Sequence, residues 1–233
     1  MEKLKVLILG DGLLGTEIRN QTGWDVISRK KNNIDVLNFD NWSNMLIGYD
    51  IILNCIANTD TYSDESQLHW DVNYKFVYEL IEYCNKNSKK LIHISTDYLY
   101  TNSENNASEN DIPVHNKTWY GYTKLLSDGL VQLICKNYLI CRCTHKPKPF
   151  PFDGAWIDQI GNFDYVDVIS ELIIKLINLN SKGLYNVGTK TKTMFELASE
   201  TKNVTKIFSP LHIPKNTSMS LNKLNSTIKN DKY

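Results

Sequence analysis

The sequence predicts an α/β fold, in which a doubly wound parallel sheet is followed by a small C-terminal region. Three observations support this prediction. Short apolar runs alternate with longer amphipathic stretches over the first two-thirds of the chain, a glycine-rich turn follows the first run, and the composition changes after Arg142. The chain has 233 residues with 42% hydrophobic content, which is enough for one sizeable core.

Five apolar or β-branched runs are the candidate strands of this sheet. Each is short and lies next to a turn-like or amphipathic segment, which is the pattern expected of repeated strand–helix units. The runs are residues 5–9, 25–28, 51–55, 91–95 and 138–142.

Two longer stretches between these runs have helical periodicity. In residues 70–84 and again in residues 120–135, apolar side chains recur at three- and four-residue steps. Each helix is therefore expected to place one apolar stripe against the sheet. The stripe residues are Val72, Phe76, Val77, Leu80 and Ile81 in the first helix and Leu125, Leu126, Leu130, Val131 and Ile134 in the second.

Two segments interrupt the alternation. Residues 101–116 are dense in Asn, Ser and Glu, so we expect a surface loop there. Residues 146–152 contain three prolines, which exclude a helix or a central strand. Beyond them the spacing predicts a helix over residues 166–179, a strand over 184–187 and a helix that begins near Thr193 with a capping box.

Charge and hydropathy exclude several classes of protein. The 26 basic residues balance the 26 acidic ones, so composition predicts no general attraction to nucleic acid or to an anionic membrane. The apolar runs are far shorter than the roughly 20 residues of a membrane span, and no secretory signal is recognisable. We therefore expect a cytoplasmic protein. The five scattered cysteines fit reduced thiols, and Cys141 with Cys143 lacks the partners of a metal site.

The glycine-rich turn is the first candidate functional motif. Gly10, Gly12 and Gly15 form a Gly-x-Gly-x-x-Gly pattern directly after the first strand and at the start of an amphipathic segment. This pattern requires a tight turn at Gly10, a close backbone approach to a pyrophosphate at Gly12 and close helix–strand packing at Gly15. In this context the pattern favours a Rossmann-like dinucleotide site over a purely structural glycine turn.

The end of the second strand bears on the choice of cofactor. An acidic residue there would bind the 2′-hydroxyl of NAD, whereas basic residues would pair with the 2′-phosphate of NADP. The strand ends at Ser28 and continues with Arg29 and Lys30, which favours NADP, although a solvated basic turn is the alternative. Asp35 and Val36 follow at a position from which they could flank the adenine.

Tyr120 and Lys124 form the candidate proton-transfer pair. They are four residues apart on a predicted helix, so both point the same way. A cation beside a phenol favours phenolate and makes its proton usable near neutral pH. Upstream, Ser95 and Thr96 place two hydroxyls at the carboxyl end of a strand, where open parallel sheets bind ligands. His93, inside that strand, is interpreted as a core residue rather than a base.

Together these motifs resemble the dTDP-4-dehydrorhamnose reductase family of extended short-chain dehydrogenases/reductases. Further segments resemble elements of the same family over nearly the whole length. They are Asn54 to Ala57 with Thr59 and Glu65, Asp71-Val72-Asn73, Asp158 to Gly161, Tyr185 to Gly188, and the late segment from Pro214 to Leu224.

The resemblance implies an NADPH-dependent reductase of a nucleotide-activated 4-keto-6-deoxysugar, with Thr96, Tyr120 and Lys124 as its catalytic residues. It implies an NAD(P)-binding domain over residues 1–145, a substrate-binding region over 146–233 that completes the sheet, and a homodimer. NADP is the expected cofactor, with NAD as the alternative, and the expected cofactor-binding residues are Gly10, Gly12, Leu13, Leu14, Gly15, Ser28, Arg29, Lys30, Asp35, Val36, Cys55, Ile56, Ala57, Thr59, Asn73, Tyr120 and Lys124.

Two departures from the family pattern leave alternatives open. The glycine loop is one residue shorter between its first two glycines, and the stretch between Arg142 and Asp158 is shorter than usual. Lys146 and Lys148 in that stretch are either solvated or available to a nucleotide diphosphate. The alternatives are a non-catalytic NADP-binding partner subunit and an epimerase or dehydratase, for which Glu65 and Asp97 are available as the additional acid or base.

Overall fold

The computed structural model describes residues 4–101, 103–115 and 117–229. The chain divides into two compact units. The first comprises Met1–Ser95 and Thr118–Ile140, and the second comprises Thr96–Lys117 and Cys141–Tyr233. Residues 96–117 and 141–145 thus belong to the second unit, and the boundary expected at residue 145 stays a prediction.

The predicted doubly wound sheet is present, and the α/β fold class is confirmed. Its strand order is β10-β5-β4-β3-β1-β2, and the pairs β1–β2, β1–β3 and β3–β4 are parallel. The strands are β1 (Val6–Leu9), β2 (Asp25–Ile27), β3 (Ile51–Asn54), β4 (Lys90–Ser95), β5 (Tyr138–Arg142) and β10 (Gly183–Asn186).

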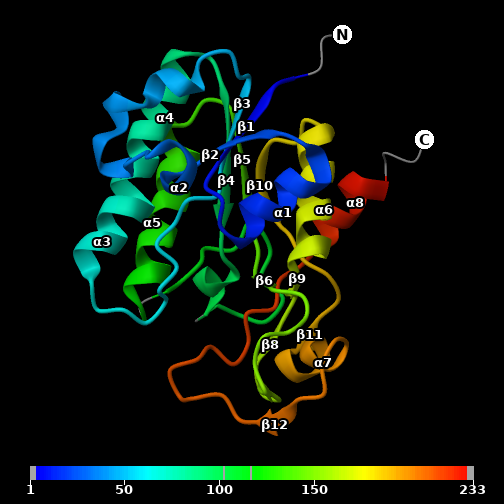
Figure 1. Cartoon of the computed structure of the whole chain (residues 1–233). Coiled ribbons are helices and arrows are strands. Elements are labelled where there is room, and N and C mark those ends of the chain that lie inside the picture. Colours follow the sequence, from blue (N-terminus) through cyan, green and yellow to red (C-terminus); the bar gives the residue numbers. More distant parts are fainter. Residues whose placement is uncertain (1–3, 102, 116, 230–233) are drawn as a thin grey trace. The chain divides into compact units, whose positions relative to one another are not determined.

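The central strands are apolar because both of their faces are covered. All four residues of β1 and of β3 are buried, which is the pattern of parallel strands enclosed by helices. Figure 1 shows α4 and α5 on one side of this sheet and α1 on the other. The carboxyl ends of four strands share one row, in which Ile27, Leu9, Asn54 and His93 are paired in order.

Five α-helices belong to the first unit: α1 (Leu13–Thr22), α2 (Arg29–Asn32), α3 (Ser66–Trp70), α4 (Phe76–Lys86) and α5 (Trp119–Ile134). The helix predicted over residues 70–84 begins earlier and is interrupted by a π-helical segment, Asp71–Lys75, between α3 and α4. Two 3₁₀ segments, Val36–Asn41 and Ser43–Leu46, precede β3. The extra residue of a π turn re-aims the following side chains, and such turns are frequent at functional sites.

Short two-stranded sheets and helices make up the second unit. β6 (His145–Lys146) pairs with β9 (Asp164–Tyr165), β7 (Gly154–Trp156) with β12 (Thr205–Ile207), and β8 (Ile160–Gly161) with β11 (Lys192–Thr193). α6 (Val166–Asn178) and α7 (Met194–Ser199) start where the sequence predicts them, and the capping box between Thr193 and Glu196 is present. The 3₁₀ segment Asp97–Tyr100 and helix α8 (Asn222–Lys229) were not predicted.

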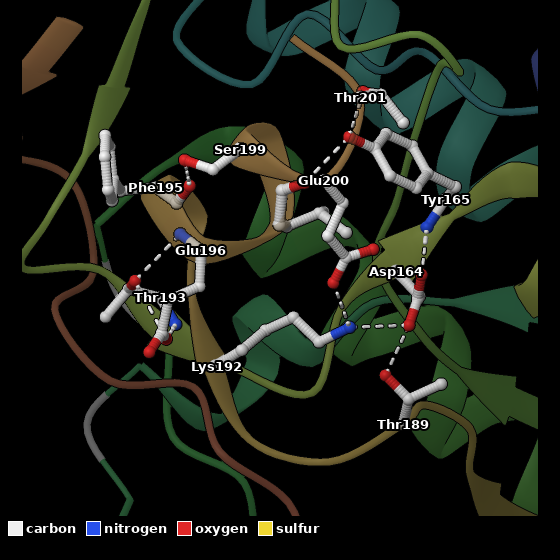
Figure 2. Close-up of polar contacts among 11 residues, drawn as sticks. Asp164, Tyr165, Thr189, Lys192, Thr193, Phe195, Glu196, Ser199, Glu200 and Thr201 are labelled. Atoms are coloured by element: carbon white, nitrogen blue, oxygen red, sulfur yellow. Dashed lines mark hydrogen bonds and ion pairs between the residues drawn. The ribbon is translucent and has the colours of Figure 1, made fainter. Parts of the chain in front are cut away.

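A buried ion pair and a hydrogen bond connect β9 to β11 and to α7 in the second unit (Figure 2). Lys192 Nζ lies 2.7 Å from Asp164 Oδ2, and the Thr189 hydroxyl donates to the same oxygen at 2.6 Å. The Tyr165 hydroxyl donates to the carbonyl of Leu197 on α7 at 2.8 Å. Burial raises the pKa of Asp164, but the bonds from Lys192 and Thr189 outweigh it, so the net shift is downward.

The expectation of a surface loop over residues 101–116 is wrong for two of its members. Most of its described residues are exposed or half-buried, but Ala107 is 2% exposed and His115 is 4% exposed. Ala107 forms an isolated bridge with Met219 and packs with Tyr100, so a distant segment covers it. Asn102 and Asn116 lie outside the described residues. Across the described part of the chain, every helix is too short or too polar to cross a membrane.

Candidate functional site

The glycine turn after β1 has the geometry that its motif requires. Gly10 has a φ of +97°, a conformation that residues with a Cβ rarely adopt. Its N–H donates to the carbonyl of Ile27 at 2.9 Å, and a Cβ here would lie 3.0 Å from Cγ1 of Ile56. The carboxyl ends of β1, β2 and β3 therefore meet at Gly10, which is where an open parallel sheet forms its ligand crevice.

Gly12 and Gly15 differ in what surrounds them. A Cβ on Gly15 would lie 2.1 Å from the Gly10 carbonyl oxygen, so only glycine fits there. A Cβ on Gly12 would meet nothing within 4 Å, and Gly12 is the N-cap of α1. An exposed backbone at the N-terminus of a ten-residue helix fits an anionic group. Leu13 is exposed and Leu14 is buried beside them.

The segment after β2 is a short helix, α2. Ser28 is buried and caps α2 by accepting a hydrogen bond from the backbone N–H of Lys31 at 3.1 Å. Arg29 and Lys30 are exposed in its first turn. The position after β2 thus presents cationic side chains and no carboxylate, as the preference for a 2′-phosphate requires.

Asp35 has a structural role in the segment that follows α2. Asp35 caps a 3₁₀ segment, since its carboxylate accepts from the N–H of Leu37 at 3.0 Å and from the Asn38 amide at 2.6 Å. Val36 is half-buried. Both oxygens of the carboxylate are therefore engaged locally, and contact with an adenine stays a prediction.

Asn73 holds the loop after β3. Cys55, Ile56 and Ala57 in this loop are half-buried, and Thr59 is exposed. The Asn73 side chain accepts from the N–H of Asn58 at 2.8 Å and donates to the Asn58 carbonyl at 3.1 Å, and it also lies 3.2 Å from the hydroxyl of Thr123 on α5. Asn73 was predicted to bind the cofactor, and here its amide joins this loop to the helix of Tyr120.

Of the apolar stripe predicted for α5, only Val131 is fully buried. Among the predicted residues, Val131 is buried, Leu125, Leu126 and Leu130 are half-buried, and Ile134 is 37% exposed. The buried face of the helix is instead mostly small or polar. It consists of Gly121, Thr123, Lys124, Ser127, Asp128 and Val131.

Lys124 is buried on this face and is bonded to β4. Its Nζ donates to the carbonyl of Ile94 at 2.7 Å and lies 3.1 Å from Nε2 of His93. Burial and the neighbouring Lys124 charge lower the pKa of His93 well below its usual value. The expectation that His93 is buried is correct, but it also contacts the candidate catalytic lysine.

Tyr120 is half-buried on the first turn of α5, where Thr118 caps the helix. The ring of His69 meets the Tyr120 ring edge-on, with 6.5 Å between the centroids. His69 is fully buried, and its Nδ1 lies 3.4 Å from the Asn73 amide nitrogen. Burial lowers the pKa of His69, although Asp60 and Glu65 act in the opposite direction.

Thr96 belongs to the second unit, whereas Tyr120 and Lys124 belong to the first. Its hydroxyl accepts from the N–H of Tyr98 at 3.2 Å and donates to the carboxylate of Asp97 at 3.5 Å. We retain the convergence of Thr96 with the other two residues as a prediction. Asp97 is buried, and its carboxylate accepts from the hydroxyls of Thr144 and Thr217, the latter at 2.8 Å.

The two lysines of the proline-rich segment have different surroundings. Lys148 pairs with Asp167 at 2.7 Å and lies over the Tyr165 ring. Burial lowers the pKa of Lys146, against the opposing effect of Asp97. At Lys148, the ion pair with Asp167 competes with the binding of a diphosphate. Among the described residues, no group of three or more His, Cys, Asp or Glu side chains is placed to hold a metal ion.

Sequence reasoning missed the roles of His69, His93 and Thr123. Two of these had a signal in the sequence. His93 lies two residues before Ser95, so strand alternation places both on one face of β4, and His69 lies four residues before Asn73 within a helical stretch. Thr123 had no such signal, because its importance arises from an amide 50 residues away.

Comparison with known families gives one match that covers most of the first unit. The family model described as "RmlD substrate binding domain" matches residues 4–145, which is more than half of the chain. The spore coat polysaccharide biosynthesis protein SpsK of Bacillus subtilis (strain 168) is 27% identical over 207 residues, which cover 79% of this chain and 73% of that protein.

Solved structures share the fold. A dTDP-4-dehydrorhamnose reductase from Bacillus anthracis str. Ames, in complex with NADP, superimposes with a TM-score of 0.83 at 23% identity and covers 97% of this chain and 93% of its own. A UDP-glucuronic acid 4-epimerase from Bacillus cereus, in complex with NAD, has a TM-score of 0.77 at 19% identity, with coverage of 97% and 90%. At these identities the likeness concerns the fold.

Proposed function

Because the chain belongs to the family of the RmlD substrate binding domain, we propose that it is an NADPH-dependent reductase of a nucleotide-activated 4-keto-6-deoxysugar. The observation that carries this proposal is the buried polar face of α5, where Lys124 is bonded to β4 one helical turn after Tyr120. A helix that only packs against a sheet would bury apolar side chains there. A phenol and an ammonium one turn apart are suited to proton transfer.

The residues of the first unit fit a dinucleotide. The glycine turn offers an open backbone at Gly12 and the N-terminus of α1 for a pyrophosphate, and Arg29 and Lys30 present cations after β2 for a 2′-phosphate. The expected binding residues from β1, β2 and the loop after β3 all lie in this unit. NADPH, when bound, supplies the hydride that reduces the sugar carbonyl carbon.

The proton for the carbonyl oxygen comes from a side chain of the protein. Tyr120 gives its phenolic proton to the carbonyl oxygen, so that the ketone becomes an alcohol. Lys124 holds a positive charge one turn away, which stabilises the phenolate that remains. Thr96 is proposed to donate a hydrogen bond to the same carbonyl oxygen and to orient it.

The alternatives predict different chemistry. An epimerase or dehydratase needs an additional acid or base, but the Asp97 carboxylate already accepts from the hydroxyls of Thr144 and Thr217. Glu65 is exposed in the first unit. A non-catalytic NADP-binding partner subunit would bind the dinucleotide in the same way but would not oxidise it with a keto-sugar. The engagement of Asp97 favours the reductase over the first alternative, and turnover decides about the second.

The test is NADPH oxidation with a dTDP-4-keto-6-deoxysugar, followed by absorbance. We expect turnover by the purified chain and a loss of about 10²–10⁴-fold in kcat for Tyr120→Phe, which removes the proton donor and keeps the ring. Tyr122→Phe is the matched control, because Tyr122 lies on the same helix and is 41% exposed. It should retain full activity.

The outcomes of this test distinguish the reductase from the two alternatives. Binding of NADPH with no turnover of the keto-sugar, together with a stable complex with a second protein, would support the partner-subunit alternative. Equal activity of Tyr120→Phe and the unmodified protein would contradict the reductase proposal. Interconversion of sugar epimers while the NADPH concentration stays constant would assign the chain to the epimerase class.

A further inference from the structure

We propose that His93 is a positioning residue for Lys124: its imidazole accepts a hydrogen bond from the lysine ammonium and fixes the place of that ammonium at the carboxyl end of β4. The inference deepens the proposed function and rests on it, because the position of Lys124 matters to turnover only in a reductase. It concerns residues of the first unit alone.

The contact is between two buried side chains on neighbouring elements. Lys124 Nζ lies 3.1 Å from His93 Nε2 and 2.7 Å from the carbonyl oxygen of Ile94. The two acceptors come from consecutive residues of one strand. Since a lysine side chain has a flexible four-carbon stem, two acceptors on a rigid strand define the ammonium position more narrowly than one acceptor does.

The chemistry of lysine fixes the state of the ring. An ammonium can only donate, so Nε2 of His93 must present its lone pair, and a neutral ring then carries its proton on Nδ1. Nδ1 lies 3.5 Å from the Asn54 amide nitrogen, which is itself a donor and therefore does not accept the Nδ1 proton, because the amide oxygen of Asn54 already accepts from the N–H of Ile56. The hydroxyl of Ser127 donates to the Lys124 carbonyl at 2.9 Å, so it is not the donor to Nε2, from which it lies 3.4 Å.

Electrostatics keeps the ring in this state. Burial and the Lys124 charge both disfavour a second cation at His93, so they lower its pKa well below the usual value. The imidazole is therefore a neutral acceptor throughout the neutral pH range. The polar side chains that face it, from β3 and α5, are Asn54, Lys124 and Ser127, and Lys124 is the charged one among them.

Packing alone does not explain a histidine at this position. Leu91 and Ile92, which precede it in β4, are apolar and fully buried. A buried imidazole costs free energy unless it is hydrogen-bonded, whereas an apolar side chain would fill the same space without that cost. His93 is also paired in register with Asn54 at the carboxyl end of the sheet, where ligands of open sheets bind. The ring therefore serves the ammonium rather than the core.

Two substitutions of His93 test the role through kinetics. His93→Leu removes the acceptor at a similar volume, and we expect kcat to fall about 10- to 100-fold with a much smaller change in KM. A less firmly held ammonium stabilises the Tyr120 phenolate less, so the high-pH limb of the kcat/KM profile should move to higher pH. His93→Gln restores an acceptor near Nε2 and should recover most of kcat.

Ile92→Ala is the matched control. Ile92 is fully buried in the same strand, and strand alternation points it to the opposite face of the sheet. This variant should lower stability while kcat and the pH profile per folded molecule stay unchanged. A shift of its pH profile equal to that of His93→Leu would show that general loosening of β4 causes the effect and would overturn the inference.

A readout independent of activity is the ¹⁵N NMR spectrum of the histidine rings. We expect His93 to have the Nδ1–H tautomer, and we expect its titration to move to higher pH in Lys124→Met, which removes the neighbouring charge. An Nε2–H tautomer in the unmodified protein would overturn the inference. So would full kcat in His93→Leu while Lys124→Met is inactive. Full activity of Lys124→Met would instead overturn the proposed function.

Discussion

α4 and α5 are neighbouring helices of the same unit, and they bury opposite kinds of side chain. The buried face of α4 consists of Phe76, Val77, Leu80, Ile81 and Cys84, whereas that of α5 consists of Gly121, Thr123, Lys124, Ser127, Asp128 and Val131. The first is stabilised by removing apolar surface from water, at roughly 1.5–3 kcal/mol for each large side chain. The second depends on hydrogen bonds, each of which adds about 1 kcal/mol to stability. Loss of one partner lowers stability by more than this, because the other partner is then buried without a hydrogen bond.

The difference shows which helix serves the core and which serves the site. An interior made of threonine, serine and lysine gives less stability than an apolar one of equal volume, so its retention on α5 calls for a reason other than folding. The bonds from this face run to elements that carry the candidate site: Lys124 to β4 and Thr123 to Asn73. We infer that α4 holds the unit together and that α5 positions its reactive groups.

The strongest test of this contrast compares one substitution on α5 with one on α4. Lys124→Met should lower kcat by about 10²–10⁴-fold, because the charge that stabilises the phenolate is lost. Leu80→Ala on α4 should instead lower the free energy of unfolding by about 2–5 kcal/mol, because Leu80 is fully buried. Turnover of NADPH with the keto-sugar and urea denaturation measure both quantities for each variant.

The contrast would be broken if the two variants behaved alike. Leu80→Ala should keep its kcat once the fraction of folded protein is taken into account. A large loss of kcat in that variant would show that α4 also positions the site.

A smaller effect is expected at the amide that joins α5 to the loop after β3. Asn73→Ala removes bonds to Asn58 and Thr123, so it should lower the free energy of unfolding by about 1–3 kcal/mol and also weaken NADPH binding. Asn85→Ala is the matched control, since Asn85 joins α4 to the end of α5 through the Ile134 carbonyl and the Lys136 N–H.

Thermal unfolding and fluorescence titration with NADPH distinguish the role of Asn73 from that of Asn85. Asn85→Ala should lose stability and keep its NADPH affinity, because its bonds lie at the other end of the helices. Equal loss of affinity in both variants would mean that the amide at Asn73 has no special relation to the dinucleotide loop.

The same contrast explains how far the sequence could predict the structure. The strands and, apart from the half-buried Val72, the α4 stripe were predictable, because burial on both faces of a strand and on one face of a helix leaves a periodic apolar pattern. On α5 the leucines have that spacing too, so the pattern selected Leu125, Leu126 and Leu130, which are half-buried. The actual face could not be read from spacing, because its polar side chains are buried only where specific partners receive them.

The candidate site was predictable to the same extent. The turn at Gly10 and the packing at Gly15 follow from local backbone chemistry, which a short motif encodes. The contacts of His93 with Lys124 and of Asn73 with Thr123 join residues 31 and 50 positions apart. Such pairs depend on the packing of α5 against β4 and the π-helical segment, and a single sequence does not contain that information.

The smallest expected effect sharpens the contrast through pH. His69 and His93, which contact Tyr120 and Lys124, both have a pKa lowered by burial below the usual 6.5. The unfolded chain therefore binds protons at these residues before the folded protein does, so their contribution to stability is complete above pH 6.5 and is lost as the pH falls below it. Each can contribute a slope of at most about 1.4 kcal/mol per pH unit.

Urea denaturation between pH 7.5 and 5.5 should show this fall in stability, and His93→Leu should reduce the slope of stability against pH. Leu80→Ala should lower the whole curve without changing the slope, because the α4 face contains no group that titrates in this range. A slope that is unchanged in His93→Leu would mean that the ring gains a proton as easily inside the protein as in water, and the polar face of α5 would then lack the electrostatic character that separates it from α4.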